Sequence, residues 1–255
     1  MEPDQTTRDL TCVTVPAPLP ELPTSIEGVS YLDIPKKYYH NDKALASHGL
    51  NIDATFKDSL RCLSYIRNVP DSEAKNLKRK IGYLFAPQND TGERAMSTLS
   101  VRSAYDLYLQ TKNFPKNSEV IMTGINIPDM LQITQEYGLV PVPVDLNVDT
   151  LQPDLEQIQA VTTEKTVCCL MAMILGITYD ITQYAEFLHP RGIDIIEDCA
   201  QSWQGLDTFR GSPYATMTMF SFGTIKHNTC YYGGIIIIRE QANLASLPAA
   251  KNLCK

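Results

Sequence analysis

The sequence predicts an α/β fold in which a mostly parallel central sheet lies between two layers of helices, a three-layer αβα sandwich. From Ser97 onward, apolar runs of strand length alternate with segments whose apolar residues recur at helical spacing. Runs such as 167–173, Val-Cys-Cys-Leu-Met-Ala-Met, are apolar at every position. Both faces of such strands must be covered, as in parallel sheets with helices above and below.

Six segments are expected to form the strands, because each is an apolar run of strand length. In chain order they are Glu119–Met122, Val140–Val144, Thr166–Met173, Ile193–Glu197, Thr216–Phe222 and Gly234–Arg239.

Four segments with helical spacing are expected to form the covering helices. Pro153 suits the first turn of the third one, and Asp154 and Glu156 lie near its N-terminus, where the helix dipole favours negative charge. In chain order the predicted helices are Ser103–Thr111, Asp129–Tyr137, Asp154–Val161 and Ile181–Leu188.

The first 95 residues are less regular. Residues 1–30 hold five of the sixteen prolines and show neither apolar period, so we expect a flexible Pro-rich arm. Within 31–95, which we treat as an N-terminal segment without an assigned fold, the apolar residues of 56–66 have helical spacing and 87–92 is typical of a loop. The basic patch at 75–80 is interpreted as a solvated face.

Composition excludes several classes of function. The formal net charge of −7 disfavours nucleic-acid binding, and the longest aliphatic run, Ile235–Ile238, is far too short to span a membrane. The acidic N-terminus resembles no secretory signal, so a cytoplasmic location is expected. Seven cysteines without C-x-x-C spacing indicate free thiols in a reducing compartment, and the four scattered histidines indicate no metal site.

In open parallel sheets, ligands bind at the carboxyl ends of the strands, so polar residues that end apolar strands are candidates for chemistry. Three groups qualify. They are the two carboxylates of 195–201 (Ile-Ile-Glu-Asp-Cys-Ala-Gln), the serine and lysine of 219–226 (Met-Phe-Ser-Phe-Gly-Thr-Ile-Lys), and the small and hydroxylic residues of 99–104 (Leu-Ser-Val-Arg-Ser-Ala), which open a helix.

The chemistry that joins these groups is that of pyridoxal phosphate. This cofactor needs a lysine to form an imine, a carboxylate to keep its pyridine nitrogen protonated, and a phosphate site, for which a helix N-terminus is suited. A nucleotide-dependent oxidoreductase is disfavoured, because no G-x-G-x-x-G follows an early strand and no P-loop motif occurs.

At these residues the sequence resembles the DegT/StrS-like sugar aminotransferases, pyridoxal phosphate enzymes of fold type I. Residues 197–201 (Glu-Asp-Cys-Ala-Gln) are similar to the family's E-D-x-A-Q, and 221–226 with Gly233-Gly234 are similar to its S-F-x-x-x-K followed by G-G. The resemblance extends from about residue 100 to 240. It implies a cofactor-binding α/β domain at 96–242 and a tail at 243–255 without the family's smaller C-terminal domain.

The resemblance also implies roles for individual residues. Lys226 would be the Schiff-base lysine and later the proton shuttle. Asp198 would pair with the pyridine nitrogen, Gln201 would hydrogen-bond the phenolic oxygen of the ring, and Ser221 would hold the phosphate. Arg102 and Ser103 would contribute the backbone N–H groups that bind the phosphate.

The implied reaction transfers an amino group from an amino acid donor, such as glutamate, to a keto sugar of the nucleotide-linked type. In this family the site lies at a dimer interface, so a homodimer is expected. Two residues depart from the family pattern: Arg102 replaces the usual residue of the phosphate loop, and Ile127 stands where the family has an aromatic over the cofactor ring.

Structural roles compete with these assignments. Asp198 could be a helix N-cap, Ser100, Arg102 and Ser103 could simply cap a helix, and Lys226 taken alone would be a solvated surface residue. We expect Glu197 to face the other side of the sheet, Trp203 to pack in the core, and 233–234 to form a tight turn. The alternative function is a catalytically impaired or truncated homologue that acts as a binding or regulatory module.

Overall fold

The computed structural model describes residues 55–65, 69–86 and 95–239. The predicted Pro-rich arm at 1–30, the predicted loop at 87–92 and the tail at 243–255 lie outside these ranges. Seven strands form one sheet in the order β1-β7-β6-β5-β4-β2-β3. They are β1 (Ala95–Thr98), β2 (Glu119–Thr123), β3 (Val140–Val144), β4 (Thr166–Ala172), β5 (Asp194–Asp198), β6 (Met217–Ser221) and β7 (Gly234–Ile238).

The mostly parallel sheet is confirmed. Strands β3, β2, β4, β5 and β6 are parallel in register, whereas β7 pairs antiparallel with both β6 and β1. All six predicted strands are present, with ends that differ by at most one residue. The short strand β1 was not predicted. Because β7 is antiparallel to both of its neighbours, β6 and β1 are parallel to each other, and their carboxyl ends lie at the same edge of the sheet.

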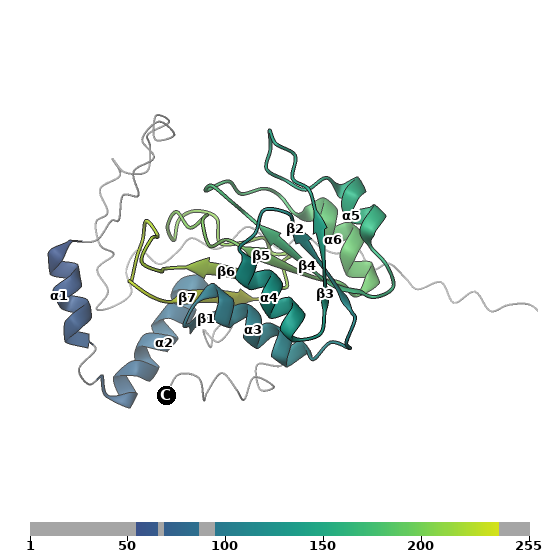
Figure 1. Cartoon of the computed structure of the whole chain (residues 1–255). Coiled ribbons are helices and arrows are strands. Elements are labelled where there is room, and N and C mark those ends of the chain that lie inside the picture. The colour runs from purple at the N-terminus through teal and green to yellow at the C-terminus, as the bar shows by residue number, and fades with distance from the viewer. Residues whose placement is uncertain (1–54, 66–68, 87–94, 240–255) are drawn as a thin grey trace, which may run out of the picture.

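Helices cover both faces of the sheet, which confirms the three layers (Figure 1). One face carries α3 and α4, whose buried side chains pack with Val120, Leu170 and Ile196. The other face carries α5, α6 and the end of α2, which pack with Ile121, Met171 and Ile195. The helices are α1 (Phe56–Tyr65), α2 (Asp71–Phe85), α3 (Val101–Lys112), α4 (Pro128–Glu136), α5 (Leu155–Val161) and α6 (Thr182–Leu188), followed by the 3-10 turn η3 (His189–Arg191).

Successive side chains of β5 point to opposite faces of the sheet, and this separates two buried carboxylates. Asp198 lies on the α3 face, whereas the side chain of Glu197 lies on the opposite face, where its oxygens accept from the Ser212 N–H at 2.9 and 3.2 Å and from Thr218 Oγ1 at 2.6 Å. Arg239 Nη1 in turn donates to Thr218 Oγ1 at 2.6 Å. Glu197 therefore serves the core, as predicted. Burial raises its pKa to about 7.

Aromatic packing holds the segment after β5. Trp203 stacks on Phe85 of α2, with 4.9 Å between ring centroids, and meets Phe220 and Phe222 edge-on. This confirms the predicted core role of Trp203, and it fixes the end of α2 against the turn that follows Asp198. Within the described ranges, no helix is both long and apolar enough to span a bilayer.

Candidate active site

The candidate residues come together at the edge where the parallel strands end. Asp198 is the last residue of β5 and lies beside Ala172 of β4. Ser221 ends β6 and pairs with Gly234, which in turn pairs with Thr98 at the end of β1. The structure therefore brings the three groups, distant in sequence, to one edge of the sheet.

Close backbone contact at this edge requires glycine at position 234. A Cβ there would lie 2.9 Å from Thr98 Oγ1, 3.1 Å from the carbonyl carbon of Ser100 and 3.2 Å from the carbonyl oxygen of Phe220. The neighbouring Gly233 has φ +116°, a conformation that side chains disfavour. The backbone bends at 231–232 and Gly234 is already the first residue of β7, so the turn predicted at 233–234 lies just before these two glycines.

Lys226 lies in the loop between β6 and β7, which is held by hydrogen bonds among its own residues. The backbone N–H of Phe222 donates to the Gly233 carbonyl and that of Cys230 to the Phe222 carbonyl, both at 2.9 Å, while the Thr229 hydroxyl donates to the Gly223 carbonyl at 2.9 Å. The Lys226 N–H donates to the Gly223 carbonyl at 3.0 Å, which makes a turn at the lysine. The side chain of Lys226 is half-buried, so a prearranged loop presents it.

Lys226 and Asp198 act on each other electrostatically. Burial lowers the pKa of the Lys226 amine, and the nearby Asp198 carboxylate opposes this shift. Burial raises the pKa of Asp198 to about 6, against the Ala200 N–H bond and the Lys226 charge. Asp198 Oδ1 accepts from the Ala200 N–H at 3.0 Å. Among the described residues, none donates a hydrogen bond to Asp198 Oδ2, so one carboxylate oxygen is left for a ligand.

The N-terminus of α3 has an occupied cap. Ser100 is the N-cap, and its hydroxyl accepts from the Ser103 N–H at 3.1 Å and lies 3.0 Å from the Ser103 hydroxyl. Thr98 Oγ1 donates to the Ser100 carbonyl at 3.0 Å. The backbone N–H of Arg102 makes no hydrogen bond to a described residue, whereas that of Ser103 is already satisfied. An anion at this position would accept a hydrogen bond from the Arg102 backbone N–H and would compete with the Ser100 hydroxyl for the Ser103 backbone N–H.

The remaining predicted residues lie at the same edge of the sheet. Gln201 is exposed, and its Oε1 accepts from the Leu175 N–H at 2.9 Å, while its amide nitrogen donates to no residue that the structure describes. Ser221 Oγ lies 3.4 Å from the Gly223 N–H. Ile127 is the N-cap residue of α4 and is 43% exposed, so an apolar side chain faces solvent just after β2.

Two polar residues near the site were not predicted. Asn126 Oδ1 accepts from the Ile127 N–H at 2.8 Å, but its amide nitrogen is buried without an acceptor among the described residues. Asp129 of α4 forms an ion pair with Arg102, at 2.9 Å between Oδ2 and Nη1. Asn126 could have been noticed because it precedes Ile127 directly. The pairing of Asp129 with Arg102 depends on helix packing, for which the sequence gives no signal.

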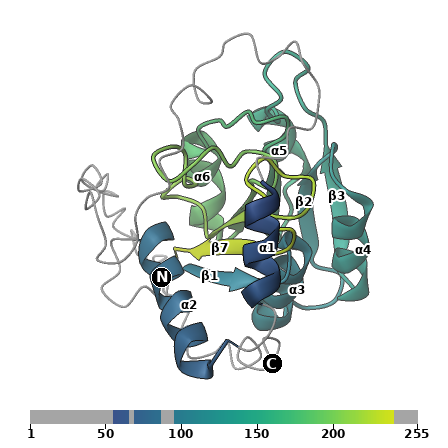
Figure 2. The ribbon, with the colours of Figure 1, turned by 90° about the vertical axis from the view of Figure 1, so that its left-hand side faces the viewer.

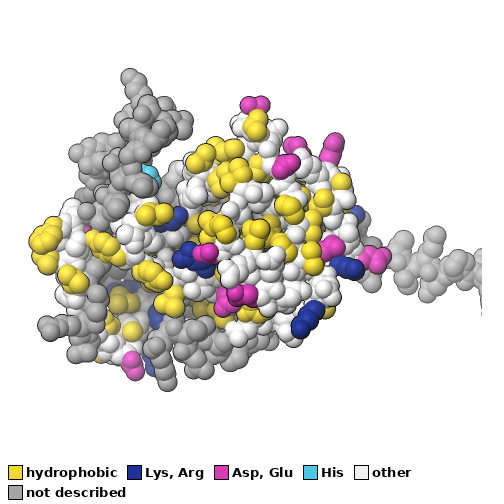
Figure 3. Space-filling model, viewed as in Figure 1, with side chains coloured by type: hydrophobic (Ala, Val, Ile, Leu, Met, Phe, Trp, Pro, Cys, Tyr) yellow, Lys and Arg dark blue, Asp and Glu magenta, His cyan; other side chains and the backbone are white. Residues whose placement is uncertain are grey.

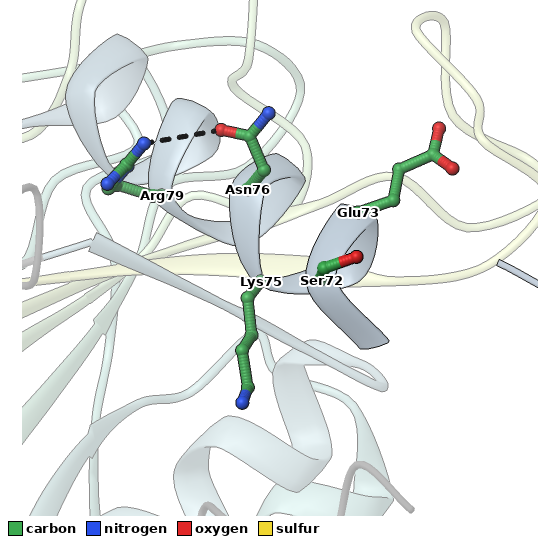
Figure 4. Close-up of a pocket in the computed structure, with 5 residues that line it drawn as sticks. All are labelled: Ser72, Glu73, Lys75, Asn76 and Arg79. Atoms are coloured by element: carbon green, nitrogen blue, oxygen red, sulfur yellow. Dashed lines mark hydrogen bonds between the residues drawn. The ribbon is translucent and has the colours of Figure 1, made fainter. Parts of the chain in front are cut away.

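A hollow of about 620 Å³ beside α2 does not belong to this site. Its described lining comes from α2 alone, and Figure 4 shows Lys75 pointing away from Glu73, Asn76 and Arg79. Arg79 reaches Asn76 at 3.5 Å on the same helix. Because Lys75, Lys78 and Arg79 are exposed, the basic patch is a solvated face, as predicted.

The buried Asp198 makes the chain's stability depend on pH. Its pKa is raised from 3.8 to about 6, so the folded chain binds the proton of this carboxyl more tightly than the unfolded chain does. The resulting contribution to the free energy of unfolding is fully present below pH 3.8 and is lost as the pH rises through about 6. Asp198→Asn is therefore expected to stabilise the ligand-free chain at pH 8 by on the order of 2 kcal/mol. Urea unfolding between pH 4 and 8 measures this, with Asp145→Asn, an exposed carboxylate after β3, as control. An Asp198→Asn variant no more stable than wild type at pH 8 contradicts it.

Comparison with known proteins assigns the family. The sequence model of the DegT/DnrJ/EryC1/StrS aminotransferase family matches residues 91–251. Similar solved structures include the aminotransferase TlmJ from Streptoalloteichus hindustanus, at 17% identity and TM-score 0.65, which covers 80% of this chain and 55% of that one. The sugar aminotransferase CalS13 from Micromonospora echinospora has 20% identity and TM-score 0.63, with 77% and 55% covered.

A third similar structure is the E. coli GDP-4-keto-6-deoxy-D-mannose-3-dehydratase with bound hydrated PLP, at 19% identity and TM-score 0.62, covering 76% of this chain and 52% of that one. At these identities the structures establish the shared fold, and the chain spans about half the length of each. The family match covers more than half of this chain, so the protein belongs to the DegT/DnrJ/EryC1/StrS aminotransferase family.

Proposed function

We propose that this chain binds pyridoxal phosphate at the strand ends and acts in the transfer of an amino group from an amino acid to a keto sugar. The observation that carries the proposal is the placement of a half-buried lysine, Lys226, within electrostatic reach of a buried carboxylate, Asp198, at the ligand edge of the sheet. Family membership and the similarity to the sugar aminotransferase CalS13 support amino-group transfer, and the similarity to the PLP-bound dehydratase supports the cofactor.

The residues present fit the cofactor. A buried carboxylate with one oxygen outside the described hydrogen bonds suits a cationic ring N–H, and the N-terminal turn of α3 beside Ser221 suits a phosphate. Ile127 would supply aliphatic contact to the ring, and the amide nitrogen of Gln201 would donate to the phenolic oxygen of the ring. Bound pyridoxal phosphate supplies an electron sink for negative charge at the carbon that loses a proton.

The chain's own residues would perform distinct tasks around that sink. Desolvation favours the neutral amine of Lys226, which is the form that attacks a carbonyl carbon and accepts a proton. Asp198 in its ionised form would keep the ring nitrogen protonated, and a cation opposite it reverses the cost of its burial. Lys226 would move the proton between the two carbons that lie on either side of the transferred nitrogen, since its loop holds the amine at the site.

The test is cofactor binding by the full chain. Purified protein mixed with pyridoxal phosphate should develop a visible absorption band, and borohydride reduction followed by peptide mapping should place the label on Lys226. Amino-group transfer is then assayed with glutamate and a panel of nucleotide-linked keto sugars. Label spread over exposed lysines would sink the proposal, and a Lys226 label without turnover would favour a binding or regulatory module.

A homodimer is part of the proposal. Large apolar side chains are exposed on the loops that follow β2, β4 and β6, at the edge where the site lies: Ile125 56%, Leu175 74%, Ile225 64% and Tyr232 65% exposed. Figure 3 shows hydrophobic side chains on the surface over α1 as well, and Figure 2 shows α1 beside the loop that joins β6 to β7. Concentrated apolar exposure is typical of a surface that another protein covers.

The dimer can be disrupted at one edge and not at the other. A chain carrying Ile225→Lys and Tyr232→Lys is expected to sediment as a monomer where the wild type sediments as a dimer, because two charges would be buried in the contact. Val140→Lys is the control, since Val140 is 43% exposed at the opposite end of the strands. Wild type that is already monomeric at assay concentration would contradict the homodimer.

A cytoplasmic location is also proposed, supported by the free thiols of Cys168, Cys169 and Cys199.

A further inference from the structure

Side-chain contacts join α3 and α4 along their length. The two helices follow successive strands on one face of the sheet and run parallel, so residues that come later on α3 meet residues that come later on α4. From the N-terminal end, the contacts are Arg102 with Asp129 at 2.9 Å, Tyr105 with Thr134 at 2.7 Å, and Asp106 with Tyr137 at 2.8 Å. The first of them lies at the edge of the sheet that carries the candidate site.

This first contact joins the two segments that flank the site. Arg102 is the second residue of α3, directly after the Ser100 cap and Val101. Asp129 is the second residue of α4, directly after Pro128 and close to Ile127 and the loop from β2. Arg102 and Asp129 are both about half exposed, at 50% and 51% of the side chain, so the pair forms without a large desolvation cost.

The charge of Arg102 is placed against the preference of its own helix. A cation near a helix N-terminus opposes the dipole, whereas Asp129 in the first turn of α4 agrees with it. The charge of Arg102 therefore does not stabilise the N-terminus of α3, and its favourable partner, Asp129, lies on the neighbouring helix. Positions that break a local rule in this way are commonly retained for a functional reason.

We propose that the ion pair between Arg102 and Asp129 fixes the first turn of α4, and with it Ile127, against the N-terminus of α3, so that both segments are in place when the cofactor binds. Arg102 and Asp129 are then positioning residues. The inference rests on the proposed function, which places the phosphate at α3 and the ring beside Ile127. It assigns to the Arg102 side chain a task different from that of its backbone N–H.

A double-mutant cycle on the full chain tests the pair. Arg102→Ala, Asp129→Ala and the double variant are titrated with pyridoxal phosphate, and the dissociation constant is read from the visible band. Positioning predicts that each single variant binds about two- to five-fold more weakly, as suits an exposed ion pair, and that the double variant is no worse than either single one. Arg102→Lys should restore part of the loss.

Tyr137→Phe is the matched control, because it removes a contact of the same two helices far from the site. It should lower the urea midpoint without changing the dissociation constant. If Arg102 instead binds the phosphate directly, only Arg102→Ala weakens binding while Asp129→Ala leaves it unchanged or strengthens it, and the proposal is overturned. It is equally overturned if neither single variant changes the dissociation constant.

A second readout separates this inference from the proposed function. The methyl carbon signal of Ile127, assigned with Ile127→Val, is recorded in the ligand-free chain. Both single variants should shift it alike, and Tyr137→Phe should not. If wild type binds no cofactor, the proposed function fails while the Ile127 signal still tests the ion pair. If wild type binds and the Ile127 signal ignores both variants, the positioning role is wrong.

Discussion

Lys226→Ala is expected to abolish covalent capture of pyridoxal phosphate by this chain. Borohydride reduction fixes the cofactor only where a neutral amine has condensed with its aldehyde, and burial lowers the pKa of Lys226 against the opposing effect of the Asp198 carboxylate. The intact mass of the reduced protein should therefore show one added cofactor in the wild type and none in the variant. Turnover, where the wild type has it, should fall by at least about a thousandfold, since removal of a covalent catalytic group has effects of that order.

The matched control is Lys165→Ala, which removes an exposed lysine before β4. It should leave both the added mass and the absorption band unchanged. Non-covalent binding should survive in the Lys226→Ala chain, because the phosphate and ring contacts remain, and equilibrium dialysis would detect it. A Lys226→Ala chain that still gains one cofactor on reduction would show that another lysine forms the bond.

Gly211→Ala is expected to destabilise the fold by about 3 kcal/mol or more. Gly211 has φ +87°, and a Cβ there would overlap Thr218 Oγ1 and lie 2.7 Å from the Thr218 Cβ and Cγ2. Thr218 is fully buried and links Glu197 to Arg239 by hydrogen bonds, so it has no room to retreat. The substitution would disturb the network under the strand that ends in Asp198.

Gly192→Ala separates the two causes of this effect. Gly192 has a similar φ of +73°, but a Cβ there would meet nothing within 4 Å, so alanine should cost only about 1 kcal/mol from backbone conformation. Urea or thermal unfolding of both variants measures the difference, which is assigned to the clash with Thr218. Equal losses in the two variants would mean that the loop before β6 moves aside.

Much of the fold could be predicted from the sequence, because strands buried on both faces leave a continuous apolar signal. Strand β4 is an example, since six of its seven residues are buried. Strand β1 escaped prediction because Ala95–Thr98 is only four residues long and half of it is polar. Its partner β7 lies almost 140 residues away in the sequence, and no local pattern indicates that pairing or its antiparallel direction.

Part of the candidate site could likewise be predicted from the sequence, and part of it could not. Asp198 and Lys226 could be identified because each lies beside an apolar strand within a short motif, and the structure places both at the ligand edge. The contact of Arg102 with Asp129 and the close approach at Gly211 join residues from separate elements. Such features depend on how helices and loops pack, so a single sequence does not reveal them.

The position of β7 between β1 and β6 has a consequence for the order in which the protein folds. Strand β1, which leads into α3, pairs in the sheet only with β7. Gly234 of β7 lies between Thr98, at the end of β1, and Ser221, at the end of β6. During synthesis the chain reaches β1 and α3 early but β7 only near residue 238. Closing so long a loop is slow and must await the late strand. The parallel strands β2 to β6 can pair before β7 is made, whereas the candidate site needs β7 to bring β1 and the start of α3 to the end of β6.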